Sequence, residues 1–202
     1  QENFLAAKEL LGTKPITFKY HFVSSVNTGL PSGLDLDGNG KTTDPGDAYG
    51  FGRYPGQYGM VVLSQFPISS DAKTFQNFLW KDMPQAMLPQ KVKPSDKNES
   101  YYSSVILDKF RLSSKSHWDL TIETPRRDIH FLVSHPTPPV FDGPEDKNGS
   151  RNHDEIRFWA DYISDNKSQY IYDDKGRRGG LTNSRSFVIA GDMNADPADG
   201  DT

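Results

Sequence analysis

The stretch FVIAGDMNADPADGD, residues 187–201, runs four apolar residues directly into acids, an amide, a proline and two glycines. An apolar run of this length bounded by glycine predicts a short buried strand that ends in a turn. Asp192 and Asn194 stand two positions apart just beyond that strand. Side chains at this spacing project to the same side, so the pair can serve one chemical task.

Asp192 and Asn194 carry functional groups that suit a phosphate site. An ionised carboxylate holds a hard cation or orients a nucleophile, and a carboxamide donates to a phosphate oxygen. The alternative is that both residues only cap the next turn, as Asp and Asn often do, and this stretch alone favours neither interpretation. A second apolar segment, FLVSH, ends in a similar way, with His135 just past its strand.

Hydrophobic periodicity places the other elements. Apolar runs and near-alternating patterns predict strands at 18–26, 58–68, 117–124, 128–135 and 186–190. The strands at 117–124 and 128–135 are separated only by PRR, which predicts a hairpin. Apolar residues three and four apart predict helices at 2–12 and 152–165. The Gly-, Pro- and Asp-rich segment 27–56 predicts a long functional loop. Such an order of elements favours an α/β or α+β layered sandwich.

Composition limits the class of protein. The chain of 202 residues suffices for one domain with a sizeable core, so we treat residues 1–202 as a single domain. The net charge of −4 disfavours binding of extended nucleic acid by bulk electrostatics. Because cysteine is absent, disulfides, thiolate metal sites and a Cys nucleophile are excluded. No stretch is long and apolar enough to predict a transmembrane segment.

Four motifs, in one order along the chain, together resemble the endonuclease/exonuclease/phosphatase superfamily, which has the DNase I-like fold. They are GQYGMVVLSQFPI at 56–68, FLVSHPTPP at 131–139, RNHDEIRFWADYI at 151–163 and FVIAGDMNADP at 187–197. The resemblance implies an α+β fold, a sandwich of two β-sheets flanked by helices, with the active site at the sheet ends. It also implies metal-dependent hydrolysis of phosphoesters, with Mg²⁺ or Mn²⁺ as cofactor.

The resemblance assigns catalytic roles to three residues of this chain. His135 would contact the scissile phosphate as a general acid or stabilise charge on it. Asp192 would orient the attacking water or help to hold the metal, and Asn194 would donate to the phosphoryl oxygens. The substrate is left open among nucleic acids, phosphoinositides, sphingolipids and small phosphate esters.

Three further residues are candidates for substrate binding. Gln57 lies where some relatives place a residue beside the catalytic histidine, and its amide would orient His135. Lys115 and His117 lie in SSKSHWD, a region where relatives often have phosphate-contacting basic residues. The alternative, a solvated turn lysine and a surface histidine, is equally consistent with the sequence.

The loop DLDGNGKTTDPGD is a second metal candidate, for structural Ca²⁺. Asp35, Asp37 and Asn39 fit the first, third and fifth positions of a calcium loop, and a glycine follows as that motif requires. A glycine stands where the bidentate glutamate belongs, so Asp44 or Asp47 has to substitute. A plain Asp/Gly turn is the alternative interpretation.

Parts of the family pattern cannot be placed in this sequence. These are an Asn-bearing first strand, a metal-binding Glu at the end of the second strand, and a Ser-Asp-His motif. We therefore expect a sandwich that is incomplete at both ends, with an incomplete metal site. The alternative function is a non-catalytic, calcium-stabilised binding or structural module of a larger exported protein, and we expect an extracellular or periplasmic bacterial location.

Overall fold

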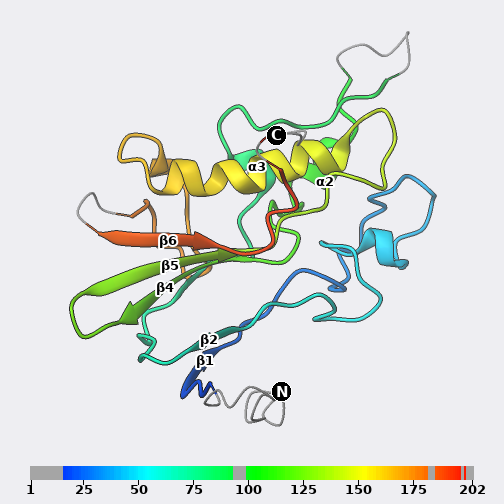
Figure 1. The fold of residues 1–202 in the computed structure, drawn as a ribbon. Coiled ribbons are helices and arrows are strands. Elements are labelled where there is room, and N and C mark those ends of the chain that lie inside the picture. Colours follow the sequence, from blue (N-terminus) through cyan, green and yellow to red (C-terminus); the bar gives the residue numbers. More distant parts are fainter. Residues whose placement is uncertain (1–15, 93–98, 182–184, 197, 199–202) are drawn as a thin grey trace.

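The computed structural model describes residues 16–92, 99–181, 185–196 and 198. This part of the chain is a mixed α/β structure with two sheets and few helices (Figure 1). The long helix α3 (Lys147–Tyr162) lies across one face of a four-stranded sheet, and a two-stranded sheet lies on the opposite side. The helix predicted at residues 2–12 lies outside the described residues, and no helix within them is long and apolar enough to span a membrane.

The smaller sheet pairs β1 (Tyr20–Phe22) antiparallel with β2 (Val62–Ser64). The larger sheet has the order β3-β4-β5-β6, and its strands are β3 (Lys73–Thr74), β4 (His117–Glu123), β5 (Asp128–Ser134) and β6 (Ser186–Ala190). Its first three strands are antiparallel, whereas β5 and β6 are parallel. The short helices are α2 (Ser104–Leu107) and the 3-10 helices Pro45–Asp47, Trp80–Asp82 and Ser168–Tyr170.

The predicted hairpin is confirmed, because β4 and β5 pair in register along their whole length. The strands predicted at 18–26 and 58–68 are confirmed only over three residues each. In the second of them Gly59 and Pro67 lie on either side of the paired residues, and neither residue type supports extension of a ladder.

Helix α3 begins five residues earlier than the predicted 152–165 and ends at Tyr162. Its first turn contains Gly149 and Ser150, whose weak helix propensity hides the start in the sequence. The start is stabilised instead by a side chain outside the helix, since Asn148 N donates to the Asp142 carboxylate at 2.6 Å. Tertiary contacts thus set a boundary that local propensity does not show.

The prediction that residues 186–190 form a buried strand is right in type and wrong in burial. β6 is an outer strand of its sheet and pairs with β5 alone among the described strands. Phe187, Val188 and Ile189 are 43%, 48% and 39% exposed. An apolar run predicts a strand, but it does not distinguish a central strand from one at an edge.

Two hydrophobic clusters hold the layers together. The cluster between α3 and the large sheet includes Phe75, Phe78, Leu132, Phe158, Trp159 and Tyr162. The cluster between the two sheets includes Val26, Val62, Trp118, Leu120 and Val133. The tryptophans Trp80, Trp118 and Trp159 are all 2% exposed or less, which confirms that they pack in the interior and do not form a stacking surface.

One buried carboxylate fixes α3 against the segment that follows β3. Asp154 is fully buried, and its Oδ2 accepts hydrogen bonds from Trp80 Nε1 at 2.7 Å and from Met87 N at 2.6 Å. Arg157, one helical turn further on, lies 3.8 Å from the other oxygen of the same carboxylate. The side chain therefore satisfies the buried indole N–H of Trp80 and one backbone N–H of the neighbouring segment.

Replacing Asp154 by alanine should lower the free energy of unfolding by about 3–5 kcal/mol, because it leaves buried donors and a cation without their acceptor. Urea denaturation measures the loss. The matched control is Asp108→Ala, which removes a 62% exposed carboxylate paired with Lys81 and should cost less than about 1 kcal/mol. Equal losses in the two variants would contradict this role of Asp154.

His117 is a second polar residue inside the α3 interface. Its ring is fully buried beside Phe158, its Nε2–H donates to the Glu155 carbonyl oxygen at 2.8 Å, and its Nδ1 accepts from Ser113 Oγ at 2.6 Å. Burial lowers the pKa of His117 below its usual value of 6.5. The imidazole is therefore neutral in the folded protein at neutral pH.

This neutral histidine makes stability depend on pH. The unfolded chain binds the proton more readily, so the contribution of His117 is present above the unfolded pKa of about 6.5 and is lost as pH falls towards the lower folded pKa. The free energy of unfolding should therefore fall between about pH 7 and pH 5, and less steeply in His117→Gln, which keeps an N–H donor but does not titrate. Urea denaturation at several pH values tests this, and parallel curves for the two proteins would rule it out.

Candidate functional site

The carboxyl ends of β5 and β6 bring the three predicted catalytic residues together. The parallel register pairs Val133 with Ala190, so His135 and Asp192 follow at the same edge of the sheet. His135 Nε2 lies 3.9 Å from Asp192 Oδ2, and both side chains are accessible, at 29% and 66% exposure. Asn194 Nδ2 donates to the Pro136 carbonyl oxygen at 3.1 Å, which ties it to the strand end that carries His135.

The approach of the two strand ends depends on the backbone of the turn after β6. Gly191 has φ +146°, and a Cβ there would lie 1.8 Å from the Ser134 carbonyl oxygen, so only glycine fits. Asn194 takes a left-handed conformation with φ 49°, and its N–H donates to Asp192 Oδ1 at 3.0 Å. The turn-capping interpretation is thus correct for the Asn194 backbone N–H, while Asp192 Oδ2 lies beside His135.

Lys115 joins this group from the loop that precedes β4. It is only 5% exposed, and its Nζ donates to the Pro136 carbonyl oxygen at 3.2 Å, the same oxygen that Asn194 contacts. Burial, and then the charge of Arg151, lower the pKa of Lys115, whereas Glu155 and Asp192 oppose the shift. Lys115 is therefore a buried cation beside the strand ends and not a solvated turn lysine.

The imidazole of His135 is less basic than an exposed histidine. Burial, followed by the neighbouring charge of Lys115, lowers its pKa, and the acidic groups Asp192 and Glu155 only partly oppose this. A neutral ring at neutral pH can donate one N–H to a phosphate oxygen.

Two residues on α3 position the loops of the site and were missed in the sequence. Glu155 is 1% exposed, and its carboxylate accepts from Ser114 N and from Thr137 N, both at 2.6 Å. Asn152 donates through Nδ2 to the carbonyl oxygens of Thr137 and Met193, at 2.7 and 3.0 Å. Asn152, Glu155 and Phe158 are spaced three apart on the buried face of the helix, but the sequence does not show that the two polar residues face inwards.

The other two substrate-binding candidates lie elsewhere. Gln57 uses Oε1 to accept from Arg53 N at 2.6 Å and so closes its own turn, and no hydrogen bond to His135 is present. His117 is fully buried, with both ring nitrogens bonded inside the protein, so substrate does not reach it. The expected substrate contact of His117 is therefore wrong, and the residue is structural.

Asp192 can supply one carboxylate oxygen to a Mg²⁺ or Mn²⁺ ion. This fits the way Mg²⁺ is often held, by one or two carboxylates together with substrate phosphates and water. Glu155 is only 1% exposed, and its two carboxylate oxygens accept backbone N–H groups and so hold the loops of the site. Among the described residues, the one group of three or more metal-ligating side chains lies in a different loop.

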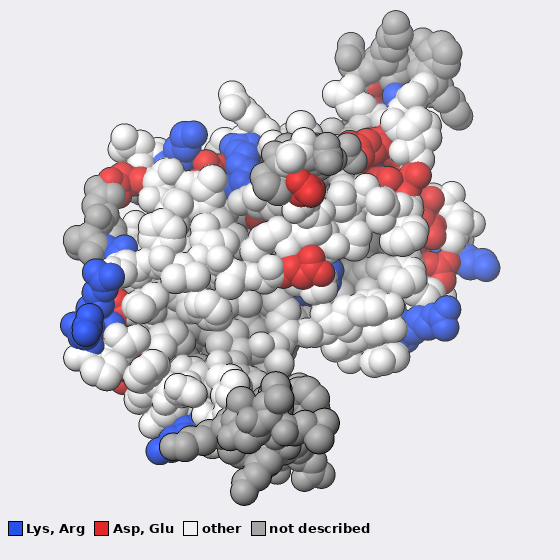
Figure 2. Space-filling view, in the orientation of Figure 1, with Lys and Arg blue, Asp and Glu red and all other residues white. Residues whose placement is uncertain are grey.

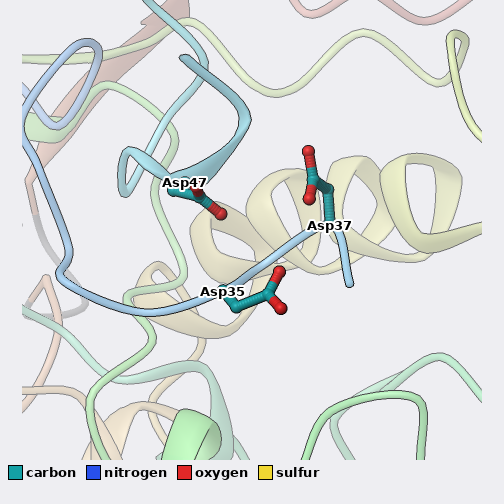
Figure 3. Close-up of side chains that lie close together, drawn as sticks. All are labelled: Asp35, Asp37 and Asp47. Carbon is teal, nitrogen blue, oxygen red and sulfur yellow. The ribbon is translucent and has the colours of Figure 1, made fainter. Parts of the chain in front are cut away.

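That group is formed by Asp35, Asp37 and Asp47, whose carboxylates face a common space (Figure 3). One oxygen from each lies within 4.8 Å of the others. Asp47, which was an expected substitute for the missing glutamate, is 1% exposed and accepts from Leu36 N at 2.9 Å. Asn39, the predicted third ligand, directs its carboxamide nitrogen at the acids, donating to Asp37 Oδ2 at 3.0 Å.

Comparison with known protein families gives a match over the length of the chain. The model of the Endonuclease/Exonuclease/phosphatase family matches residues 1–202. Searches among curated proteins and among solved structures found no match. Because the family match spans the chain, and His135, Asp192 and Asn194 meet at one sheet edge, the protein belongs to the endonuclease/exonuclease/phosphatase family, whose members hydrolyse phosphoesters.

Proposed function

We propose that His135, Asp192, Asn194 and Lys115 bind a phosphoester and promote attack of water on its phosphorus atom. The observation that carries the proposal is the convergence of one accessible carboxylate and three donors at the ends of β5 and β6. Donors placed where negative charge develops usually make the largest contribution to catalysis of such reactions.

Each side chain has a defined part in this proposal. Lys115 has further N–H donors beyond the one that contacts the Pro136 carbonyl oxygen, and Asn194 has a second one, so both can also bind phosphoryl oxygens. His135 donates its ring N–H to the same phosphate. Asp192 Oδ2 accepts a hydrogen bond from the attacking water, whose oxygen forms the new P–O bond as the bond to the leaving oxygen breaks.

A divalent cation, Mg²⁺ or Mn²⁺, would bind to Asp192 and would act as a Lewis acid on the phosphoryl oxygens. The substrate is better sought among small or short phosphoesters than among long nucleic acids. Acidic and basic side chains are interspersed over the face drawn in Figure 2, and no broad basic patch of the described residues covers that face. The positive charge of the site is instead local, at Lys115.

Turnover of bis-p-nitrophenyl phosphate and p-nitrophenyl phosphate, with Mg²⁺, Mn²⁺ or Ca²⁺, tests the proposal. We expect metal-dependent release of nitrophenol that falls about 10²–10³-fold in Asn194→Ala and in His135→Ala, since each removes one donor. Asp192→Ala should abolish the metal-dependent release of nitrophenol. The ester that is hydrolysed faster distinguishes a diesterase from a monoesterase.

The matched control is Asp196→Ala, which removes an exposed acid from the same loop and should turn over as the wild type does. Circular dichroism verifies that each variant is folded. Absence of turnover with every metal in folded wild-type protein would favour the alternative, a non-catalytic binding or structural module.

For the second metal candidate we propose structural Ca²⁺ at Asp35, Asp37 and Asp47. Carboxylate oxygens are the ligands that Ca²⁺ prefers, and the loop already folds around the Asp35 carboxylate, which accepts from the backbone N–H groups of Gly38, Asn39 and Gly40. The ion would relieve the repulsion among three carboxylates held close together. Its effect would be on stability and not on the chemical step.

Calcium at 100 times its dissociation constant should stabilise the folded protein by about 2.7 kcal/mol, and thermal unfolding with CaCl₂ or EDTA measures the shift. Asp37→Asn should reduce the shift, whereas Asp108→Asn, at an exposed position outside the loop, should not. An unfolding temperature that does not change in millimolar calcium would contradict calcium binding at this loop.

A further inference from the structure

The side chain of Met193 lies in the turn that carries Asp192 and Asn194. Its Sδ accepts a hydrogen bond from Ser134 Oγ at 3.8 Å, and Ser134 is the last residue of β5. The Met193 carbonyl oxygen accepts from Asn152 Nδ2 at 3.0 Å. Met193 therefore joins the turn after β6 to the end of β5 through its side chain and to α3 through its backbone.

Ser134 connects this thioether to the core of the protein. Ser134 is 1% exposed, and its Oγ accepts from Trp159 Nε1 at 2.9 Å while it donates to Met193 Sδ. The indole of Trp159 belongs to the cluster between α3 and the large sheet. Because a hydroxyl has one hydrogen to donate, the single O–H of Ser134 is directed at the sulfur. A chain of two hydrogen bonds thus runs from α3 to the turn of the phosphate site.

Met193 is also accessible to small molecules in solution. Met60 and Met193 are half-buried, whereas Met83 is 2% exposed and Met87 is 48% exposed. The chain has four methionines and no cysteine, so thioethers are the sulfur groups that an oxidant can attack. A methionine sulfur takes up one oxygen atom and becomes a sulfoxide, which is polar and can be reduced again. Exposure therefore favours this reaction at Met193 and disfavours it at Met83.

The contact between Met193 and Ser134 leaves no room for an added oxygen. Sδ and Oγ are 3.8 Å apart, so no further heavy atom fits between them. A sulfoxide oxygen would either accept the Ser134 O–H and push Met193 outwards, or face the protein without a donor. The second arrangement costs free energy, which favours movement of the side chain into solvent. Either outcome separates Met193 from Ser134 and displaces its neighbours Asp192 and Asn194.

We propose that Met193 is an oxidation site through which a peroxide disconnects the Asp192–Asn194 turn from the end of β5. The sulfur lone pair attacks one peroxide oxygen, the O–O bond breaks, a sulfur–oxygen bond forms, and hydrogen peroxide leaves as water. The sulfur loses two electrons, and the peroxide gains them. The effect on catalysis rests on the proposed function, because it acts through the distance between His135 Nε2 and Asp192 Oδ2, which is 3.9 Å before oxidation.

Treatment with dilute hydrogen peroxide, followed by peptide mass spectrometry, tests the modification without requiring turnover. Met193 and the exposed Met87 should each gain one oxygen atom, and Met83 should stay unmodified. The urea concentration at the midpoint of unfolding should fall in the oxidised wild type. It should change less in Met193→Leu, which conserves the volume of the side chain but has no sulfur to oxidise. The matched control is Met87→Leu, which removes the 48% exposed thioether and should respond to peroxide as the wild type does.

Turnover of bis-p-nitrophenyl phosphate measures the consequence for the site. The oxidised wild type should turn over about 10–10²-fold more slowly than before treatment, as expected for misplaced groups, and methionine sulfoxide reductases should restore the rate. Met193→Leu should keep most of its own untreated rate after peroxide.

Two results would overturn the inference: a Met193 that stays reduced while Met87 is oxidised, or equal losses of rate and of urea midpoint in Met193→Leu and the wild type. If the untreated wild type shows no turnover with any metal, the proposed function fails. The mass spectra and the urea midpoints then still decide whether oxidation of Met193 loosens the turn.

Discussion

The site depends on one buried carboxylate that joins two loops. Glu155 accepts from Ser114 N, next to Lys115 in the chain, and from Thr137 N, two positions after His135. Glu155 belongs to the helix face that packs on the large sheet through Phe158 and Trp159. The packing of α3 therefore sets the spacing of the two loops, and a shift of this helix would move both halves of the site.

The proposed binding of a phosphate by an acidic protein depends on where its positive charges lie. Arg151 is 7% exposed and donates to the carbonyl oxygens of Leu112, Arg111 and Tyr49, which fixes the loop that precedes β4. Lys115 lies in the same loop and is buried as well. Both charges are screened by salt much less than surface charges are, so they act locally although the net charge is −4.

Patterns of short range predicted the hairpin and the types of α3 and β6, because the chain shows the periodicity directly. The grouping of His135, Asp192 and Asn194 was implied by the family resemblance. The positions of His117 and Glu155 could not be predicted in this way. A polar residue in an apolar pattern is equally compatible with the surface and with the interior, and only its tertiary partners decide between the two. For His117 the partner is the Glu155 carbonyl oxygen, and for Glu155 the partners are the backbone N–H groups of Ser114 and Thr137.

The parallel pairing of β5 with β6 has a consequence for how the site is assembled. β5 ends at Ser134 and β6 begins at Ser186, with the whole of α3 between them, so the pair closes a long loop and forms few local contacts. The β4–β5 hairpin, with adjacent partners, needs no such closure. Because loop-closure entropy delays long-range pairs during folding, Asp192 and Asn194 would reach His135 late, after hairpin and helix have formed. A folding intermediate that contains every secondary-structure element except β6 would bury most of the core and still lack a phosphate site.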